Sequence, residues 1–141
     1  MTIPTSIPKG RREKLLKTIL ISICNSLMAV SITHTLRQVG DFRVCPIGSC
    51  GEIAKECAEA AADVLLMEAS YNPGATLDDR LSEAAALRFV CPSCKVILLC
   101  DENSAPEIAR QVAIAKKDGL IDDFLYSSVS ESYLTAMLSA L

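Results

Sequence analysis

The chain has 141 residues, 50% of them hydrophobic, which suits one domain with a hydrophobic core and excludes an intrinsically disordered chain. Its formal net charge of −3 excludes a basic, nucleic-acid-binding surface spread over the whole domain.

The sequence carries no visible targeting segment. The apolar run 19–24 is far too short to span a membrane, and residues 1–16 lack an apolar stretch ahead of a cleavage site. Prolines, a glycine and basic residues in 1–16 instead predict a flexible N-terminal arm, followed by one domain over residues 17–141. Seven cysteines without an export signal predict reduced thiols and a cytoplasmic location.

The first apolar run predicts a strand followed by a helix. Apolar and β-branched residues fill 18–23, and Asn25 or Ser26 can then cap a helix that continues to Val39. Gly40 ends this helix. The apolar stripe expected on it comprises Met28, Ile32, Leu36 and Val39.

The second strand and helix lead into the most apolar strand of the chain. Residues 42–47 indicate a strand, and the capping box that begins at Ser49 opens an alanine-rich helix over 50–61. The run 63–68 is apolar between two terminal carboxylates, which is typical of a central parallel strand buried on both faces. Glu68 therefore falls at the strand end that points into a ligand crevice.

The same alternation continues in the second half of the chain. Thr76 can cap a helix that runs to about Phe89, and residues 95–100 indicate a fourth strand. Residues 104–107 have the spacing of another capping box with an early proline, and the helix that they open ends near Gly119.

The last strand and helix complete the pattern. Residues 123–126 indicate a fifth strand, and Ser128 can cap the final helix. Five strands that alternate with helices predict an α/β fold, a three-layer α/β/α sandwich around a doubly wound parallel sheet. The apolar stripe expected on the final helix comprises Val129, Tyr133, Met137 and Leu141.

Several short blocks occur in the order and spacing of a known family. They are Phe-Arg-Val at 42–44, Gly-Glu-Ile-Ala at 51–54, Ala-Asp-Val-Leu-Leu-Met at 62–67, and the closing run 123–130. Over residues 17–141 the chain resembles the receiver domain of two-component response regulators. That resemblance implies a flavodoxin-like, five-stranded parallel sheet in the order 2-1-3-4-5, and signal transduction in a phosphorelay.

The positions that support phosphorylation in receivers hold other residues here. A working receiver is similar in needing two acidic residues after strand one, an aspartate ending strand three, a small hydroxyl residue ending strand four and a lysine ending strand five. This chain has, in that order, Ile23 and Cys24, Glu68, Cys100 and Ser127. The resemblance therefore implies a degenerate receiver, or pseudo-receiver.

These side chains are poorly suited to phosphoryl transfer. Mg²⁺ prefers carboxylate oxygens and water, so an isoleucine and a thiol in place of the acidic pair remove most of its binding energy. Ser127 is neutral and short, and cannot neutralise developing charge as a lysine does. We therefore expect no metal, no cofactor and no enzymatic activity, and signalling through protein contacts without phosphorylation.

Glu68 has two interpretations. Its carboxylate resembles a permanent stand-in for a phosphorylated aspartate, which would lock the domain in one signalling state; alternatively, it is a solvated residue at a strand end.

Two further positions near this rim have open roles. Asp101 and Glu102 are expected close to Glu68, and the three carboxylates either hold a cation or are hydrated. Phe124 matches the switch aromatic of the family, and its alternative role is core packing.

The cysteines suggest further sites. Cys91 and Cys94 have zinc or redox spacing. The predicted topology places them at the bottom of the sheet and Cys50 at the top, which excludes one tetrahedral site that also uses Cys45. A disulfide between Cys91 and Cys94 under oxidation, or two free thiols, remain the alternatives. The cysteines expected to act as small buried hydrophobes are Cys45, Cys57 and Cys100.

Cys24 supports an enzymatic alternative. A cysteine just after strand one resembles the phosphocysteine nucleophile of sugar-transport IIB domains and of small tyrosine phosphatases. The loop 25–28 that follows has no glycine and lacks the phosphatase arginine. The sole histidine, His34, falls off the buried stripe of its helix and is expected to face solvent.

The resemblance also implies where partners bind. In related receivers the fourth helix, fifth strand and fifth helix form the interaction and dimer face, which here correspond to the helix that ends near Gly119, strand 123–126 and the last helix. A DNA-binding output domain that regulates transcription often follows a receiver. We expect a protein partner, a second copy of the chain among the candidates, and neither membrane binding nor direct nucleic-acid binding by this domain.

Overall fold

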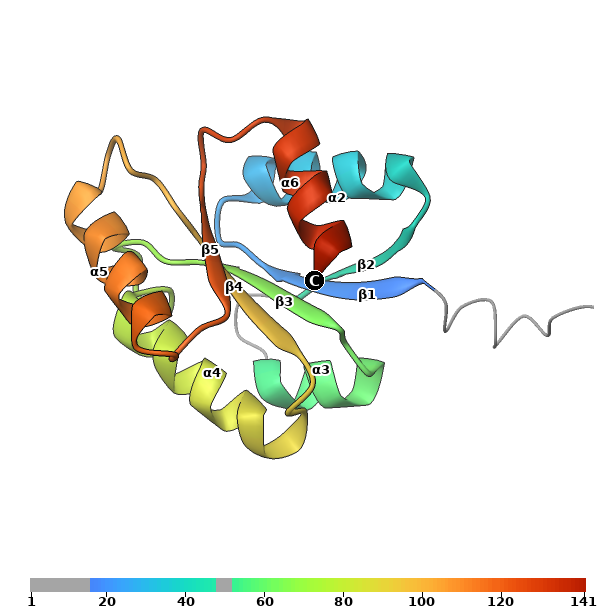
Figure 1. Ribbon diagram of the computed structural model, residues 1–141, viewed down its shortest axis with the longest axis horizontal. Coiled ribbons are helices and arrows are strands. Elements are labelled where there is room, and N and C mark those ends of the chain that lie inside the picture. The colour runs from blue at the N-terminus through green and yellow to red at the C-terminus, as the bar shows by residue number, and fades with distance from the viewer. Residues whose placement is uncertain (1–15, 48–51) are drawn as a thin grey trace, which may run out of the picture.

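The computed structural model describes residues 16–47 and 52–141, and its five parallel strands form one sheet in the order β2-β1-β3-β4-β5. This order and the layers of helices on both faces confirm the predicted flavodoxin-like sandwich (Figure 1). The strands are β1 (Lys17–Ser22), β2 (Phe42–Pro46), β3 (Val64–Glu68), β4 (Lys95–Cys100) and β5 (Asp123–Tyr126). The helices are α2 (Ser26–Val39), α3 (Ile53–Ala60), α4 (Leu77–Val90), α5 (Pro106–Lys117) and α6 (Glu131–Ala140).

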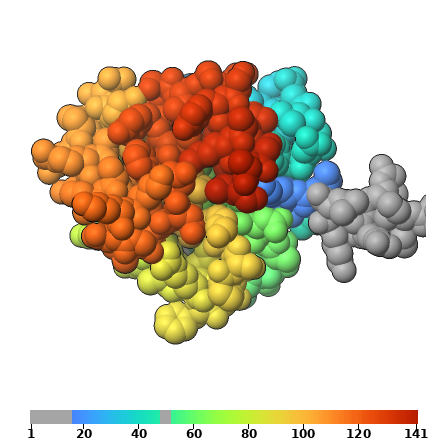
Figure 2. Space-filling model, viewed as in Figure 1, coloured from blue at the N-terminus to red at the C-terminus, as the bar shows by residue number. Residues whose placement is uncertain are grey.

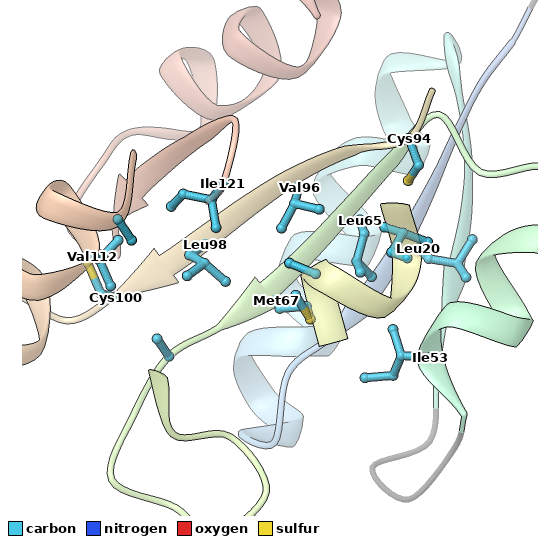
Figure 3. Close-up of a cluster of buried hydrophobic side chains, with 14 of the residues drawn as sticks. Leu20, Ile53, Leu65, Met67, Cys94, Val96, Leu98, Cys100, Val112 and Ile121 are labelled. Atoms are coloured by element: carbon cyan, nitrogen blue, oxygen red, sulfur yellow. The ribbon is translucent and has the colours of Figure 1, made fainter. Parts of the chain in front are cut away.

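Alternate residues of the strands supply two hydrophobic cores, one on each face of the sheet. Leu65 and Met67 of β3 pack on the side of α3, α4 and α5, whereas Val64 and Leu66 pack on the side of α2 and α6. Because side chains alternate across a strand, β3 must be apolar along its length to serve both cores. The larger core is drawn in Figure 3, where side chains of the strands meet Ile53 of α3 and Val112 of α5.

Several helix ends form as the sequence predicts. The side chain of Asn25 accepts a hydrogen bond from Met28 N, and Gly40 adopts a left-handed φ of 83° as the C-cap of α2. At the start of α4, Thr76 and Asp79 form a reciprocal capping box. The hydrogen bonds from the hydroxyl and backbone of Thr76 lower the pKa of Asp79.

Three predicted helix starts were wrong or lie outside the described residues. No side-chain cap forms at 104–107, because the N-cap of α5 is Ala105, which has no polar side chain; the early proline is as predicted. Helix α6 begins at Glu131 and is capped by Ser130, two residues after the predicted cap. The predicted cap Ser49 lies outside the described residues, and α3 starts at Ile53 rather than at residue 50.

The predicted stripes of the two helices on the α2/α6 face are confirmed in part: Leu36 is in the core, and Met28, Ile32, Val129 and Met137 are partly buried against it. In α6, Leu134 and Leu138 are buried, while Tyr133 is largely exposed. Leu134 and Leu138 lie one residue after Tyr133 and Met137, so the buried stripe is centred beside the predicted one. In α2, Leu36 is buried with Thr33, whereas Val39 at the helix end is exposed.

Lys17 joins the start of β1 to the end of the last helix. Its Nζ donates to the carbonyl oxygens of Leu138 at 2.8 Å and Ser139 at 3.0 Å. An ammonium group at a helix C-terminus satisfies carbonyls that have no partner within the helix and complements the helix dipole. The predicted arm 1–16 lies, apart from its last residue, outside the described residues.

Candidate functional site

The predicted site residues gather where the parallel strands end. Ile23 and Cys24 follow β1, Glu68 ends β3, Cys100 ends β4, and Ser127 follows β5. The carboxyl ends of parallel strands share one edge of the sheet, which is where ligands bind in open α/β folds. Two hydrogen bonds connect these positions directly, Ser127 N to Cys100 O at 2.8 Å and Cys24 N to the Glu68 carboxylate at 2.5 Å.

Glu68 turns its carboxylate toward the backbone of the β1–α2 loop. The residue is 8% exposed, and its Oε1 accepts the hydrogen bond from the N–H of Cys24. The carboxylate is therefore not the solvated surface group that one interpretation expected. It fixes the first residues after β1 against the end of β3, because a charge-assisted hydrogen bond is stronger than a neutral one.

A buried arginine that the sequence analysis missed binds the same edge of the sheet. Arg80 of α4 is 2% exposed, and its Nε donates to the carbonyl of Glu68 at 2.7 Å. Its Nη2 donates to the carbonyl of Ser22 at 3.0 Å, and its Nη1 donates to the Ser22 hydroxyl at 3.1 Å. The guanidinium group thus connects the last residue of β1 with the last residue of β3.

Glu83, one helical turn after Arg80, completes this arrangement. Its carboxylate lies 3.1 Å from Nη1 of Arg80. Burial raises the pKa of Glu83, and the charge of Arg80 opposes that shift. The helical spacing of Arg80 with the apolar Ala84 and Leu87 is a weak signal in the sequence, which the neighbouring charged residues obscure; the structure buries all three.

Cys100 and Phe124 are the residues that the family resemblance assigned to the side-chain switch. The Cys100 thiol donates to the carbonyl of Leu125 at 3.7 Å, and burial, with the nearby charges of Glu102 and Asp101, raises the pKa of Cys100 to about 11. Phe124 is partly buried against the larger core, edge-to-face with Tyr126 at a centroid distance of 5.5 Å. Core packing thus accounts for the position of Phe124.

The carboxylates after β4 serve the loops of this edge. Hydrogen bonds from Ser104 and Asn103 lower the pKa of Asp101. Glu102 accepts a hydrogen bond from the hydroxyl of Ser128, which joins the β4–α5 loop to the β5–α6 loop. Within residues 16–47 and 52–141, no three histidine, cysteine, aspartate or glutamate side chains are grouped so that they could hold a metal ion.

These donors do not fit the magnesium ion that a working receiver needs. A hard divalent cation needs several oxygen ligands, whereas the positions after β1 hold a hydrocarbon and a thiol, and Glu68 is directed to a backbone amide. The fixed positive charge of Arg80 at the ends of β1 and β3 further disfavours a second cation nearby.

The other predicted candidates are distributed over the molecule. His34 is exposed on α2, as expected. Cys91 is partly exposed and Cys94 is buried, and both are free thiols in the loop that precedes β4; Cys50 lies outside the described residues. Across the described ranges, no helix has the length and apolar character needed to cross a membrane.

Ser127 also lines a groove beside the sheet edge. The groove has a volume of about 350 Å³ and lies between the first turns of α2 and the start of α6. Leu99 is among the apolar residues that line it, and Asn25 and Ser130 are among the polar ones. The edge therefore offers small neutral side chains where the family resemblance would require a lysine.

Known proteins resemble this chain in structure. No protein-family model matches the sequence, and no curated protein matches it. A CheY-like protein (TadZ) from Pseudomonas aeruginosa PAO1 superposes with a TM-score of 0.69 at 17% identity, over 88% of this chain and 98% of that one. A response regulator from Thermotoga maritima gives 0.68 at 14% identity, over 89% and 97%.

A third similar structure is described as an enzyme and not as a response regulator. A protein described as an adenylate cyclase from Rhodopirellula baltica superposes with a TM-score of 0.69 at 17% identity, over 89% of this chain and 87% of that one. At such low identities the likeness concerns the fold and not the chemistry. From strand order, layer arrangement and these superpositions together, the chain has the fold of CheY-like response-regulator receiver domains.

Proposed function

We propose that this chain is a receiver-like signalling domain that works by binding proteins in the cytoplasm, without phosphorylation and without catalysis of its own. The observation that carries the proposal is the set of bonds made by Arg80 and Glu68. A receiver needs an open site for a divalent ion and a phosphoryl group. Here a guanidinium group and a carboxylate belonging to the chain bind the backbone at that edge instead.

These internal bonds favour one fixed arrangement of the sheet edge. A switch needs two states that a ligand binds with different affinity. Arg80 is bound to both β1 and β3, and Glu68 holds the β1–α2 loop, so side chains of the protein itself fix the geometry of these strand ends. In this proposal Glu68 keeps the domain in a single signalling state, and any regulation of transcription occurs through an attached output domain.

Treatment with acetyl phosphate and MgCl₂ should leave the mass of the intact protein unchanged. The physical reason is that neither a metal-binding carboxylate pair nor a charge-neutralising lysine is present at the predicted positions. Intact-mass spectrometry checks this, with an active receiver as the positive control. Amide NMR spectra recorded with beryllofluoride should likewise show no shifts at 66–70 or 99–102. A stoichiometric phosphate adduct on a carboxylate would contradict the proposal.

The same measurement distinguishes the enzymatic alternative at Cys24. A phosphocysteine would give a one-phosphate mass gain that is stable to acid and lost with iodine. The structure offers little support for that chemistry, because the Cys24 N–H already donates to the Glu68 carboxylate, whose negative charge repels a phosphate. An adduct that disappears in Cys24→Ser would establish the alternative and overturn the proposed function.

The surface formed by α5, β5 and α6 is the proposed interaction face. Strand β5 is an edge strand, and Figure 2 shows the orange and red segments that include these elements forming one continuous side of the molecule. Large side chains on the two helices are exposed, with Ile114 of α5 at 52% and Tyr133 of α6 at 57%. Aromatic and aliphatic residues in an otherwise polar surface are characteristic of the centre of an interface.

Ile114→Glu should weaken self-association by about tenfold or more, because a buried charge at the centre of a homodimer interface has no partner. Analytical ultracentrifugation over a concentration series measures the effect. Phe89→Glu is the matched control, since Phe89 is 89% exposed on α4, away from the proposed face, and should leave association unchanged. A monomeric wild-type protein at high concentration, or equal effects of the two variants, would exclude the dimer.

A further inference from the structure

Strand β2 forms one margin of the sheet, with β1 on its inner side and, among the described residues, no strand on its outer side. Such an edge carries backbone N–H and C=O groups that have no partner in the sheet, and a strand of another molecule can pair with them. The opposite margin, β5, belongs to the proposed interaction face. The margin at β2 has no role so far, and its outward backbone groups decide whether it can pair.

Two backbone bonds show which residues of β2 point outward. The carbonyl of Asp41 accepts from Lys17 N at 3.3 Å, and Ile47 N donates to the carbonyl of Ile21 at 2.8 Å. The backbone groups of Asp41 and Ile47 therefore point toward β1. Because the direction alternates along a strand, three residues of β2 point their backbone groups away from the sheet. They are Phe42, Val44 and Pro46.

An arginine of α2 binds the middle residue of this edge. Nη2 of Arg37, in the last turn of α2, donates to the carbonyl of Val44 at 3.0 Å. Leu36, the residue before it, packs in the same core as Val44, which fixes the end of the helix over the strand. A paired strand lies about 4.8 Å from its neighbour, and beside Val44 the guanidinium group takes up that space.

The neighbouring outward residues make the Val44 carbonyl essential for pairing. Pro46 has no backbone N–H, so it cannot donate to a partner strand. Opposite residues of an antiparallel pair exchange two N–H···O bonds. Two copies related by a two-fold axis can form such pairs with Val44 opposite Val44, or with Phe42 opposite Val44. Both registers use the carbonyl to which Arg37 is bound.

We propose that Arg37 closes the outer edge of β2 against pairing with a second copy of this chain. A second copy is the partner that fits, because both registers are complementary to themselves and each copy supplies the same donors and acceptors. Arg43 adds to the closure, since the register with Phe42 opposite Val44 places the two Arg43 side chains opposite each other, and like charges there are destabilising.

Arg37→Ala should open this edge. The variant is made together with Ile114→Glu, so that the proposed interaction face does not contribute to association. In analytical ultracentrifugation, the double variant should dimerise with a dissociation constant at least about tenfold lower than that of Ile114→Glu alone. Amide hydrogen exchange followed by NMR should show the Val44 N–H protected at least about tenfold in the dimer, because it then donates to the partner strand.

Arg43→Ala in the same Ile114→Glu background is the matched control. It also removes one arginine from this region, but the Arg43 guanidinium donates to the carbonyl of Ala60, at the end of α3, and not to the β2 edge. It should leave the dissociation constant unchanged. Arg37 is exposed, so its replacement should preserve the fold, and the amide spectrum of the core strands checks this.

The two proposals fail separately in this design. Ile114→Glu alone reports on the proposed interaction face, whereas the difference between the double variant and Ile114→Glu reports on the edge of β2. Equal dissociation constants for the double variant and Ile114→Glu would overturn the role of Arg37. A dimer whose Val44 amide stays unprotected, or an equal gain of association in the Arg43→Ala control, would also overturn it.

Discussion

Replacing Arg80 with alanine should lower the free energy of unfolding by about 3–5 kcal/mol. The variant leaves the carbonyl groups of Ser22 and Glu68 and the partly buried carboxylate of Glu83 without their donor. Buried acceptors without donors lose their hydration and gain nothing in exchange. Urea denaturation followed by circular dichroism measures the loss as a lower midpoint with an unchanged slope.

Arg88→Ala is the control for this experiment. Arg88 lies on the same helix but is exposed and donates a single bond, to the carbonyl of Gly119. Its removal should cost less than about 1 kcal/mol. Arg80→Lys adds a second comparison: lysine keeps the charge but cannot reproduce the planar fork, so an intermediate loss is expected. Equal stabilities of Arg80→Ala and Arg88→Ala would show that the buried guanidinium does not hold the sheet edge together.

Replacing Leu66 with alanine should lower the free energy of unfolding by about 2–5 kcal/mol. Leu66 is fully buried at the centre of β3, in register with Ile21 of β1 and Ile97 of β4. The substitution removes apolar contacts and leaves a cavity that the neighbouring strands cannot close, because they are fixed by their backbone bonds. The midpoint of urea denaturation again reports the change.

Leu27→Ala provides the matched surface control. Leu27 is 82% exposed at the start of α2, so its truncation should change stability by less than about 0.5 kcal/mol. The same chemical change at the two positions isolates the contribution of burial. If both variants unfold at the wild-type midpoint, β3 is not the central element of the core.

The spacing of apolar residues along the sequence was sufficient to predict the fold. The strand 63–68 was placed within one residue, because a short run of apolar residues between two carboxylates occurs where both faces of a strand are buried. Helix starts were less accurate, since several serines can serve as caps. Ser128 was predicted as the cap of α6, but its hydroxyl bonds Glu102, a residue 26 positions away that local patterns do not reveal.

The candidate site was only partly predictable. The strand ends located Glu68, Cys100 and Ser127 at one edge, because parallel strands bring their carboxyl ends together. The partners of these residues were not predictable. Arg80 sits in a charged segment that is typical of an exposed helix face, and its burial depends on carbonyl groups of two strands that are distant in the sequence.

The bonds from Lys17 to the end of α6 have a consequence for how further modules could be arranged. They hold the point where the chain enters the sheet beside the point where the last helix finishes, and Figure 1 shows the C-terminus next to β1. Segments fused before Lys17 and after Leu141 would therefore leave the domain at the same end. Two such attachments would be neighbours in space and able to touch each other.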